Sequence, residues 1–205
     1  MHDVIVVGGG AAGMSAALFT AKNDLDTVVF DADETWLHKA HLFNYLGIES
    51  VDGGEFVETG REQIQEFGAT YVAEEVTSAT QTAAGYAVES EPETDAGEAG
   101  DATAGDQTRE STYLVLATGT DRSLAEELNC EFTDEDVVDV DVTMETSVED
   151  AYATGAMVRA QEWQAVISAG DGAAAALNIL SKEKGEHFHD FDTPGDADAT
   201  FDDMA

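Results

Sequence analysis

Short apolar runs alternate with a helical segment at the start of the chain. Residues 4–7 are continuously apolar, which is typical of a strand buried on both faces. Residues 14–22 are rich in Ala and Leu and predict a helix, and residues 27–30 form a second apolar run. Strand, helix and strand follow one another within the first 30 residues, so the pattern predicts a βαβ unit with parallel strands.

The rest of the chain mixes strand and helix patterns. Residues 32–54 have no clear period and are predicted to be irregular, whereas residues 54–67 place apolar side chains on one helical face before Gly68. Residues 170–184 predict an Ala-rich helix. Further strands are expected at residues 70–76, 85–90, 111–118, 136–143 and 151–155.

Two segments carry many acidic and few apolar residues. Residues 91–110 contain no aromatic residue, so they predict a disordered acidic loop inserted into a β-meander formed by the strands on either side. Residues 185–205 predict a loosely held acidic tail. We therefore expect one domain over residues 1–184, of the α/β class, with a parallel sheet, a β-meander and three layers.

Acidic side chains dominate the composition, with 44 acidic against 8 basic residues and a formal charge of −36. This charge repels phosphate backbones and anionic lipids, so we expect no nucleic-acid partner. Neither a membrane span nor a signal peptide is predicted, because no apolar run is long enough. Molar salt shortens the screening length to about 3 Å, so the charge favours a halophilic, cytoplasmic protein over an ordinary acidic one.

Cysteine and histidine give little sign of redox or metal chemistry. Cys130 is the single cysteine, so the chain can form neither an internal disulphide nor a Cys-x-x-Cys pair. Acidic neighbours are expected to raise its pKa, and we interpret it as structural. The pairs His38/His41 and His187/His189 lack a complete ligand set, so no metal site is predicted.

Glycines between the first strand and the first helix have the spacing of a dinucleotide site. Gly8, Gly10 and Gly13 form G-x-G-x-x-G, in which the glycines permit a tight turn, close approach to pyrophosphate and close helix packing. Phosphate charge is favoured at the helix N-terminus. Asp31 ends the second strand and can accept hydrogen bonds from a ribose diol, which makes the motif specific.

Five segments in order resemble one family. They are VIVVGGGAAGMSAA with VVFDA, NYLG at 44–47, VLATGT at 115–120, METSVEDAYATG at 144–155 and WQAVISAGDGAAAA at 163–176. Together they resemble the Rossmann-like FAD-binding domain of thioredoxin reductases and their relatives. The resemblance implies that the N-terminal glycine motif binds FAD.

The resemblance assigns the adenosine half of FAD to the N-terminal segments. Asp31 would bind the adenosine ribose, and the backbone of Val76 would meet the adenine. The residues that would line the pyrophosphate are Gly8, Gly10, Ala12 and Gly13.

The flavin half is assigned to later segments. Asn44 would lie near the flavin end, while Gln164 and Ala165 would approach the pyrimidine edge of the ring. The helix start near residues 170–173 would direct a positive dipole at that edge, with Asp171 as its cap. The two residues that would pass under the cofactor are Thr118 and Gly119.

Two departures from the family pattern change the expected chemistry. Thioredoxin reductases insert an NADPH domain with a Cys-x-x-Cys pair where this chain has about 25 residues, between Gly119 and Met144. The family's Gly-Asp pair, whose Asp holds the ribityl chain, is Gly155 and Ala156 here. Loss of that hydrogen bond would weaken binding about tenfold to a hundredfold.

Basic residues are scarce, so those near the expected site are notable. We hypothesise that His38, Lys39 or His41 compensates by contacting pyrophosphate or flavin, and Arg159 also follows the altered motif. A solvated loop without that role is the alternative.

The residues and the resemblance together predict an FAD flavoprotein, an oxidoreductase that cannot act as a disulphide reductase by the family mechanism. Its electrons would come from outside the fold, from NAD(P)H, a ferredoxin-like protein or a partner subunit. A homodimer is one assembly that the resemblance implies. The alternative is a non-catalytic module that binds FAD or another dinucleotide as a structural or sensing ligand.

Overall fold

One mixed sheet forms the centre of the molecule in a computed structural model that describes residues 1–92 and 107–196. Four parallel strands lie in the order β5 (Thr70–Val72), β2 (Thr27–Phe30), β1 (His2–Val7) and β8 (Gln107–Leu116). A fifth parallel strand, β9 (Ala151–Ala153), pairs with the end of β8. The βαβ unit predicted for the first 30 residues is confirmed.

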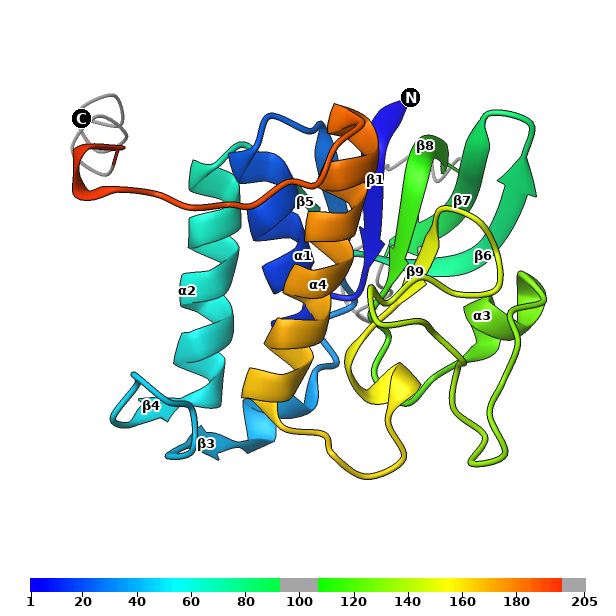
Figure 1. The fold of residues 1–205 in the computed structure, drawn as a ribbon. Coiled ribbons are helices and arrows are strands. Elements are labelled where there is room, and N and C mark those ends of the chain that lie inside the picture. The colour runs from blue at the N-terminus through cyan, green and yellow to red at the C-terminus, as the bar shows by residue number, and fades with distance from the viewer. Residues whose placement is uncertain (93–106, 197–205) are drawn as a thin grey trace, which may run out of the picture.

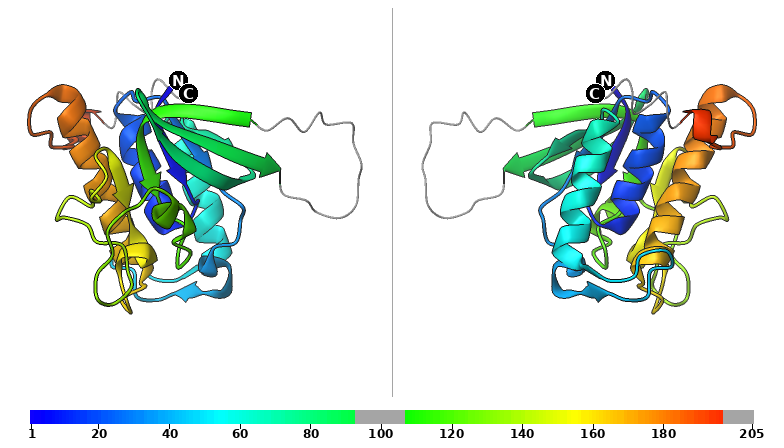
Figure 2. Two further views of the ribbon diagram at one scale, coloured as in Figure 1. Left: turned by 90° about the vertical axis from the view of Figure 1, so that its right-hand side faces the viewer. Right: turned by 90° about the vertical axis from the view of Figure 1, so that its left-hand side faces the viewer.

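The sheet is the middle one of three layers, as the sequence predicts (Figure 1). The helices α1 (Ala11–Lys22), α2 (Gly53–Glu66) and α4 (Ala165–Lys184) cover one face. The other face is covered by the antiparallel strands β6 (Glu74–Thr82) and β7 (Gly85–Pro92) and by α3 (Ser123–Glu127) (Figure 2). Each interface has its own core, one under the helices around Val4, Val6 and Ile179 and one under the meander around Ile5, Leu114 and Leu116.

The alternation of side chains along β1 explains the two cores. Successive residues of a strand point to opposite faces, and residues 4–7 are all apolar. Val4, Ile5 and Val6 are fully buried, and Val7 is only 4% exposed. The continuous apolar run therefore marks a strand with both faces covered.

Strand β8 belongs to both parts of the sheet. Its first residues pair with β7 in the meander, and its last residues pair with β1 and β9. The predicted acidic loop at residues 91–110 is too long at both ends, because residues 91–92 finish β7 and residues 107–110 begin β8. Its remaining part, residues 93–106, lies outside the described residues.

Two predicted strands differ from the structure. Residues 70–76 are two strands, since β5 pairs with β2 and β6 turns away to pair with β7. Residues 136–143 form only isolated bridges. Asp141 Oδ1 accepts hydrogen bonds from the backbone of Thr143 and Glu145, and Asp136 has φ +62°, so turns replace the alternating strand.

Short elements occupy the segment predicted to be irregular at residues 32–54. These are the 3₁₀ helix η1 (Trp36–Lys39) and the two-residue strands β3 (His41–Leu42) and β4 (Val51–Asp52). A second 3₁₀ helix, η2 (Gly155–Val158), follows β9. The helix predicted at residues 170–184 begins five residues earlier, at Ala165, and ends at Lys184, with Gly185 as its C-terminal cap at φ +67°.

The start of the acidic tail is attached to the domain. Lys22 Nζ, at the end of α1, lies 2.8 Å from Asp190 Oδ1 and 2.5 Å from Asp192 Oδ2. The backbone N–H of Phe188 donates to Ser181 Oγ on α4. Residues 185–196 therefore cross from α4 over the end of α1 toward α2, with contacts to both α1 and α4 (Figure 1). Residues 197–205 lie outside the described part.

None of the helices formed by the described residues is long and apolar enough to cross a membrane.

Close contact between α1 and α4 gives a stability prediction. A Cβ on Gly172 would lie 2.0 Å from the carbonyl oxygen of Ala12, whereas a Cβ on Gly170 would meet nothing within 4 Å. We expect Gly172→Ala to lower the free energy of unfolding by about 1–3 kcal/mol, because the helices must separate. Gly170→Ala, the matched control, should raise it by about 0.5–1 kcal/mol. Urea unfolding measures both, and equal effects would contradict the proposed contact.

Candidate functional site

The glycine turn between β1 and α1 brings three backbone segments together. A Cβ on Gly8, which has φ +108°, would lie 2.3 Å from the carbonyl oxygen of Ala117 at the end of β8. A Cβ on Gly13 would lie 1.8 Å from the carbonyl oxygen of Gly8. Only glycine permits this conformation and these distances. The turn thus lies at the carboxyl edge of the parallel strands, where open α/β sheets bind ligands.

The helices α1 and α4 both begin without a side-chain cap. Gly10 caps α1 and has no side chain, and Gln164 makes no capping hydrogen bond to α4 within the described residues. By contrast, Asp52 Oδ1 accepts from Gly54 N at the start of α2. Neither α1 nor α4 carries an acidic residue in its first turn, although the chain is strongly acidic. Both N-termini can therefore donate backbone N–H groups to an anionic or polar ligand.

Asp31 lies beside the glycine turn and is held there by two side chains. It is 6% exposed, and a Cβ on Gly9 would lie 2.3 Å from its Oδ2. Arg61 Nη2 on α2 donates to Oδ2 at 2.8 Å, and the hydroxyl of Tyr71 on β5 donates to the same atom at 2.9 Å. Burial and the Asp31 carboxylate raise the pKa of Tyr71, so the phenol stays protonated as a donor. Both hydrogen bonds thus go to the same carboxylate oxygen of Asp31.

Arg61 also connects Asp31 to a second carboxylate. Its Nη2 donates to Asp33 as well, and its guanidinium lies 4.9 Å from the centre of the Tyr71 ring. Asp33 Oδ1 also lies 2.6 Å from His38 Nε2. Partial burial opposes ionisation of Asp33, but the hydrogen bonds from His38 and Arg61 outweigh it and lower the pKa of Asp33.

The residues assigned to the flavin end meet at the start of α4. Asn44 Nδ2 donates to Gln164 Oε1 at 2.7 Å, which joins the loop after β3 to the helix N-terminus. Ala165 is the first residue of α4. Trp36 and Trp163, the two tryptophans of the chain, are both exposed. The positive end of the α4 dipole therefore lies at Gln164 and not near residues 170–173.

Asp171 does not cap a helix, contrary to the sequence prediction. It lies inside α4, is 5% exposed and forms a two-bond ion pair with Arg159 at 2.8 and 2.5 Å. The hydrogen bonds that Arg159 donates to Asp171 raise the pKa of Arg159. Arg159 is thereby attached to the helix by its carboxylate partner.

Gly155 and Ala156 lie at the start of η2, against α1. Gly155 has φ +66°, and its added Cβ would lie 3.2 Å from the Cβ of Ala12. The carbonyl oxygen of Ala156 accepts from Arg122 Nη2 at 3.1 Å. Arg122 follows Thr118 and Gly119, so the two predicted cofactor segments are joined directly.

The remaining predicted residues have less distinctive surroundings. Thr118 Oγ1 donates to the carbonyl oxygen of Asp121, and a Cβ on Gly119 would meet nothing within 4 Å. Val76 is buried on β6 in register with Ser90, while Val72, on β5, accepts the backbone hydrogen bond of Asp31. Lys39 is exposed, with Nζ 5.8 Å from the centre of the Trp36 ring. The roles of Val76 and Lys39 stay predictions.

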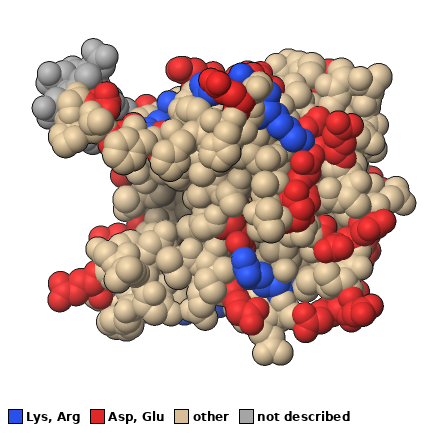
Figure 3. Space-filling view, viewed as in Figure 1, with Lys and Arg blue, Asp and Glu red and all other residues tan. Residues whose placement is uncertain are grey.

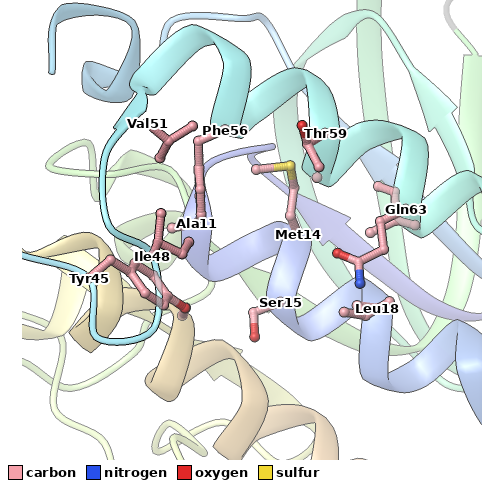
Figure 4. Close-up of a pocket in the computed structure, with 13 residues that line it drawn as sticks. Ala11, Met14, Ser15, Leu18, Tyr45, Ile48, Val51, Phe56, Thr59 and Gln63 are labelled. Carbon is pink, nitrogen blue, oxygen red and sulfur yellow. The ribbon is translucent and has the colours of Figure 1, made fainter. Parts of the chain in front are cut away.

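A cavity of about 350 Å³ lies elsewhere, between α1 and α2 (Figure 4). Its walls are mainly apolar and include Met14, Ile48 and Phe56, with Gln63 at the rim. None of the predicted cofactor residues lines it. The surface over these helices is largely uncharged, whereas acidic side chains gather on the right of the same face (Figure 3).

Within the described ranges, no group of three His, Cys, Asp or Glu residues is placed to hold a metal ion. Cys130 is buried, and burial rather than its acidic neighbours is what raises the pKa of its thiol.

Sequence reasoning missed Arg61, Tyr71 and Arg122. Arg61 and Tyr71 fix Asp31, but they come from α2 and β5, whose packing on β2 is a tertiary feature. The rarity of basic residues was the available signal, since Arg61 and Arg122 are two of only eight.

Comparisons with known proteins place the chain in a family. A family model described as pyridine nucleotide-disulphide oxidoreductase matches residues 2–124. The thioredoxin reductase of Listeria monocytogenes is 29% identical over 122 residues, which cover 58% of this chain and 34% of that protein. That of Treponema pallidum is 38% identical over 87 residues, which cover 38% of this chain and 26% of that protein. The chain thus spans about a third or less of these relatives.

Solved structures give the same fold over a longer span. A thioredoxin reductase from Gloeobacter violaceus has a TM-score of 0.79 at 19% identity, covering 94% of this chain and 99% of that one. A ferredoxin-flavin thioredoxin reductase from Clostridium acetobutylicum has a TM-score of 0.71 at 16% identity, covering 90% and 99%. The Rossmann-like α/β architecture is therefore shared.

The lowered pKa of Asp33 gives a pH prediction. A carboxyl with a depressed folded-state pKa stabilises the fold above its unfolded pKa of about 3.9 and loses that contribution as pH falls through the folded value. We expect Asp33→Asn to reduce the free energy of unfolding more at about pH 5 than at about pH 3, because the contribution of the carboxylate is lost as pH falls. Urea unfolding across pH at fixed salt tests this, with the exposed Glu62→Gln as charge control. A difference independent of pH would contradict it.

Proposed function

Because this chain belongs to the pyridine nucleotide-disulphide oxidoreductase family, we propose that it binds FAD and acts as a thioredoxin reductase-like oxidoreductase supplied with electrons by an external donor. The observation that carries the proposal is the pair of uncapped, acid-free helix N-termini of α1 and α4 at one edge of the sheet. One of these positions would bind the pyrophosphate of a dinucleotide, and the other would meet its far ring.

The residues present fit the chemistry of FAD. Glycines at positions 8 and 13 leave the first turn free of side chains, so backbone N–H groups at the start of α1 would bind the pyrophosphate. Asp31, fixed by Arg61 and Tyr71, would accept the ribose hydroxyls. Gln164 and the N-terminus of α4 would hold the pyrimidine edge. Bound FAD would supply two-electron redox chemistry, while the protein orients and tunes it.

Electrons and substrate are both proposed to come from outside this fold. Between Gly119 and Met144 the chain forms α3, isolated bridges and a series of turns, and Cys130 is buried. A dithiol step of the family type therefore has no partner sulphur in this chain. The proposed donor is NAD(P)H, a ferredoxin-like protein or a partner subunit. We place the protein in a salt-rich cytoplasm on the basis of its charge.

The second candidate function is a non-catalytic FAD module. It is favoured by Ala156, which supplies no carboxylate to a ribityl chain, and by the single, buried thiol. Anaerobic addition of NAD(P)H or a reduced ferredoxin to the FAD-loaded protein separates the two functions. Bleaching of the flavin absorbance supports the oxidoreductase, and a bound flavin that no donor reduces supports the module.

Asp31 provides a test of FAD recognition. We expect Asp31→Asn to weaken FAD about tenfold to a hundredfold, because a charged hydrogen bond to the ribose is lost, and to leave FMN affinity unchanged, because FMN has no adenosine. Quenching of Trp36 and Trp163 fluorescence in high salt measures both affinities. Asp33→Asn is the matched control, since Asp33 also contacts Arg61. Equal losses for FAD and FMN would place the aspartate away from adenosine, and absence of any flavin uptake by the wild type would refute FAD binding.

A substitution of Lys39 tests whether this cation compensates for the missing aspartate at Ala156. Of the three candidates, His38 contacts Asp33 and His41 contacts Ser50, whereas Lys39 contacts only the Trp36 ring within the described residues. We expect Lys39→Ala to lower the fraction of FAD retained through gel filtration, measured by absorbance, because a cation near the cofactor anion is lost. Lys184→Ala removes another lysine that lies over an aromatic ring, and it should have no effect. Unchanged retention in Lys39→Ala removes the hypothesis.

A further inference from the structure

The cavity between α1 and α2 has uncharged walls (Figure 4). On α1 it is lined by Ala11, Met14, Ser15 and Leu18, which are three or four residues apart and so share one face of the helix. Phe56 belongs to the facing wall on α2. Among the described residues, those that line the cavity include no acidic and no basic side chain, although the chain has 44 acidic residues. The cavity is thus an apolar groove with an uncharged rim.

The start of the acidic tail is attached at the end of this same face of α1. Lys22 follows Leu18 by four residues, so it continues the row of side chains that lines the cavity. Its Nζ donates to both carboxylate oxygens of Asp190, at 2.8 and 3.0 Å, and to Asp192 Oδ2 at 2.5 Å. The tail runs from there toward α2 (Figure 1). These ion pairs therefore hold the tail beside one end of the groove.

The chain that follows this attachment is long enough to enter the groove. Phe201 is nine residues beyond Asp192, and an extended chain of that length spans up to about 30 Å. A turn at residues 193–196 shortens this reach, but the five residues after Asp196 alone span about 16 Å. Along α1, the distance from Lys22 to Met14 is only about 12 Å. The length of the tail therefore matches the length of the groove.

Residues 197–205, which lie outside the described residues, carry side chains that suit an apolar cavity. Their sequence contains Phe201 and Met204 among three aspartates. The cavity has a volume of about 350 Å³, and a cavity of about 150 Å³ already holds benzene, so a phenyl ring fits. The uncharged rim avoids the like-charge repulsion that an acidic surface would exert on the three aspartates.

We infer that residues 197–205 dock into this cavity of their own chain, with the ring of Phe201 between α1 and α2. The ion pairs of Lys22 keep the tail close, so docking is intramolecular and has a high effective concentration. It removes the apolar walls around Met14 and Phe56 from water. The inference is independent of the proposed function, because the described residues that line the cavity include none of the predicted cofactor residues.

The methyl resonance of Met14 tests this inference in protein that is isotopically labelled at its methionine methyl groups. An aromatic ring in the cavity shifts this resonance, so we expect Phe201→Ser to move it. The methyl group of Met157, which is buried in the opposite core, should keep its position. Phe191→Ser is the matched control, because Phe191 is exposed in the described part of the tail. An unmoved Met14 resonance in Phe201→Ser, or an equal movement in Phe191→Ser, would overturn the inference.

Disulphide trapping shows whether the docked tail belongs to the same chain. Gln63 lies at the cavity rim, whereas the exposed side chain of Glu62 lies about 100° round α2 from it. We expect Gln63→Cys/Thr200→Cys to form a disulphide within the monomer about tenfold faster than Glu62→Cys/Thr200→Cys, as measured by gel filtration and mass spectrometry. Equal rates would mean that the tail meets both positions at random, which contradicts docking. A covalent dimer would assign the cavity to a second copy of the chain and overturn the inference.

Discussion

Close backbone contact around α1 is the constraint on which the rest of the molecule depends. The carbonyl oxygen of Ala12 lies where a side chain on Gly172 would be, and the carbonyl oxygen of Gly8 lies where a side chain on Gly13 would be. These contacts bring α1 against α4 and against the end of β1. They also place the N-terminus of α1 beside Ala117, Asp31 and Gly155. The candidate site is thus a consequence of how tightly one helix packs.

Three of the few basic side chains contact the segments that form the candidate site. Arg61, Arg122 and Arg159 lie near the carboxyl edge of the sheet, where they hold Asp31, η2 and α4 respectively. Two of the three have carboxylate partners and one has only carbonyl groups. Each fixes backbone or a carboxylate next to a predicted cofactor segment. Scarce positive charge is therefore used to position the site as well as to balance the acidic surface.

Sequence patterns predicted the parts of the fold whose cause is local. The apolar run at residues 4–7, the glycine spacing and Asp31 lie within the first 31 residues, and the structure brings them together. Patterns failed where side chains competed with the backbone, as at Asp141, whose hydrogen bonds produce a turn inside an apparently alternating strand. They also failed for Asp171, because its partner Arg159 precedes α4 and the true helix start lies six residues before the aspartate. The contacts of Arg61 and Tyr71 required knowledge of which helix packs on which strand.

The parallel pairing of β8 with β9 has a consequence for how such chains vary in length. Register places Ala151 opposite Leu114 and Ala153 opposite Leu116, and Thr154 N donates to the carbonyl oxygen of Leu116. The connection between these strands therefore leaves and rejoins the sheet at neighbouring points that pair directly with each other. The residues of this connection are not needed to pair β8 with β9. The entropy cost of closing a loop also grows only slowly with its length. The connection between β8 and β9 can therefore be a short turn or a complete folded unit without a change in the two strands that it joins.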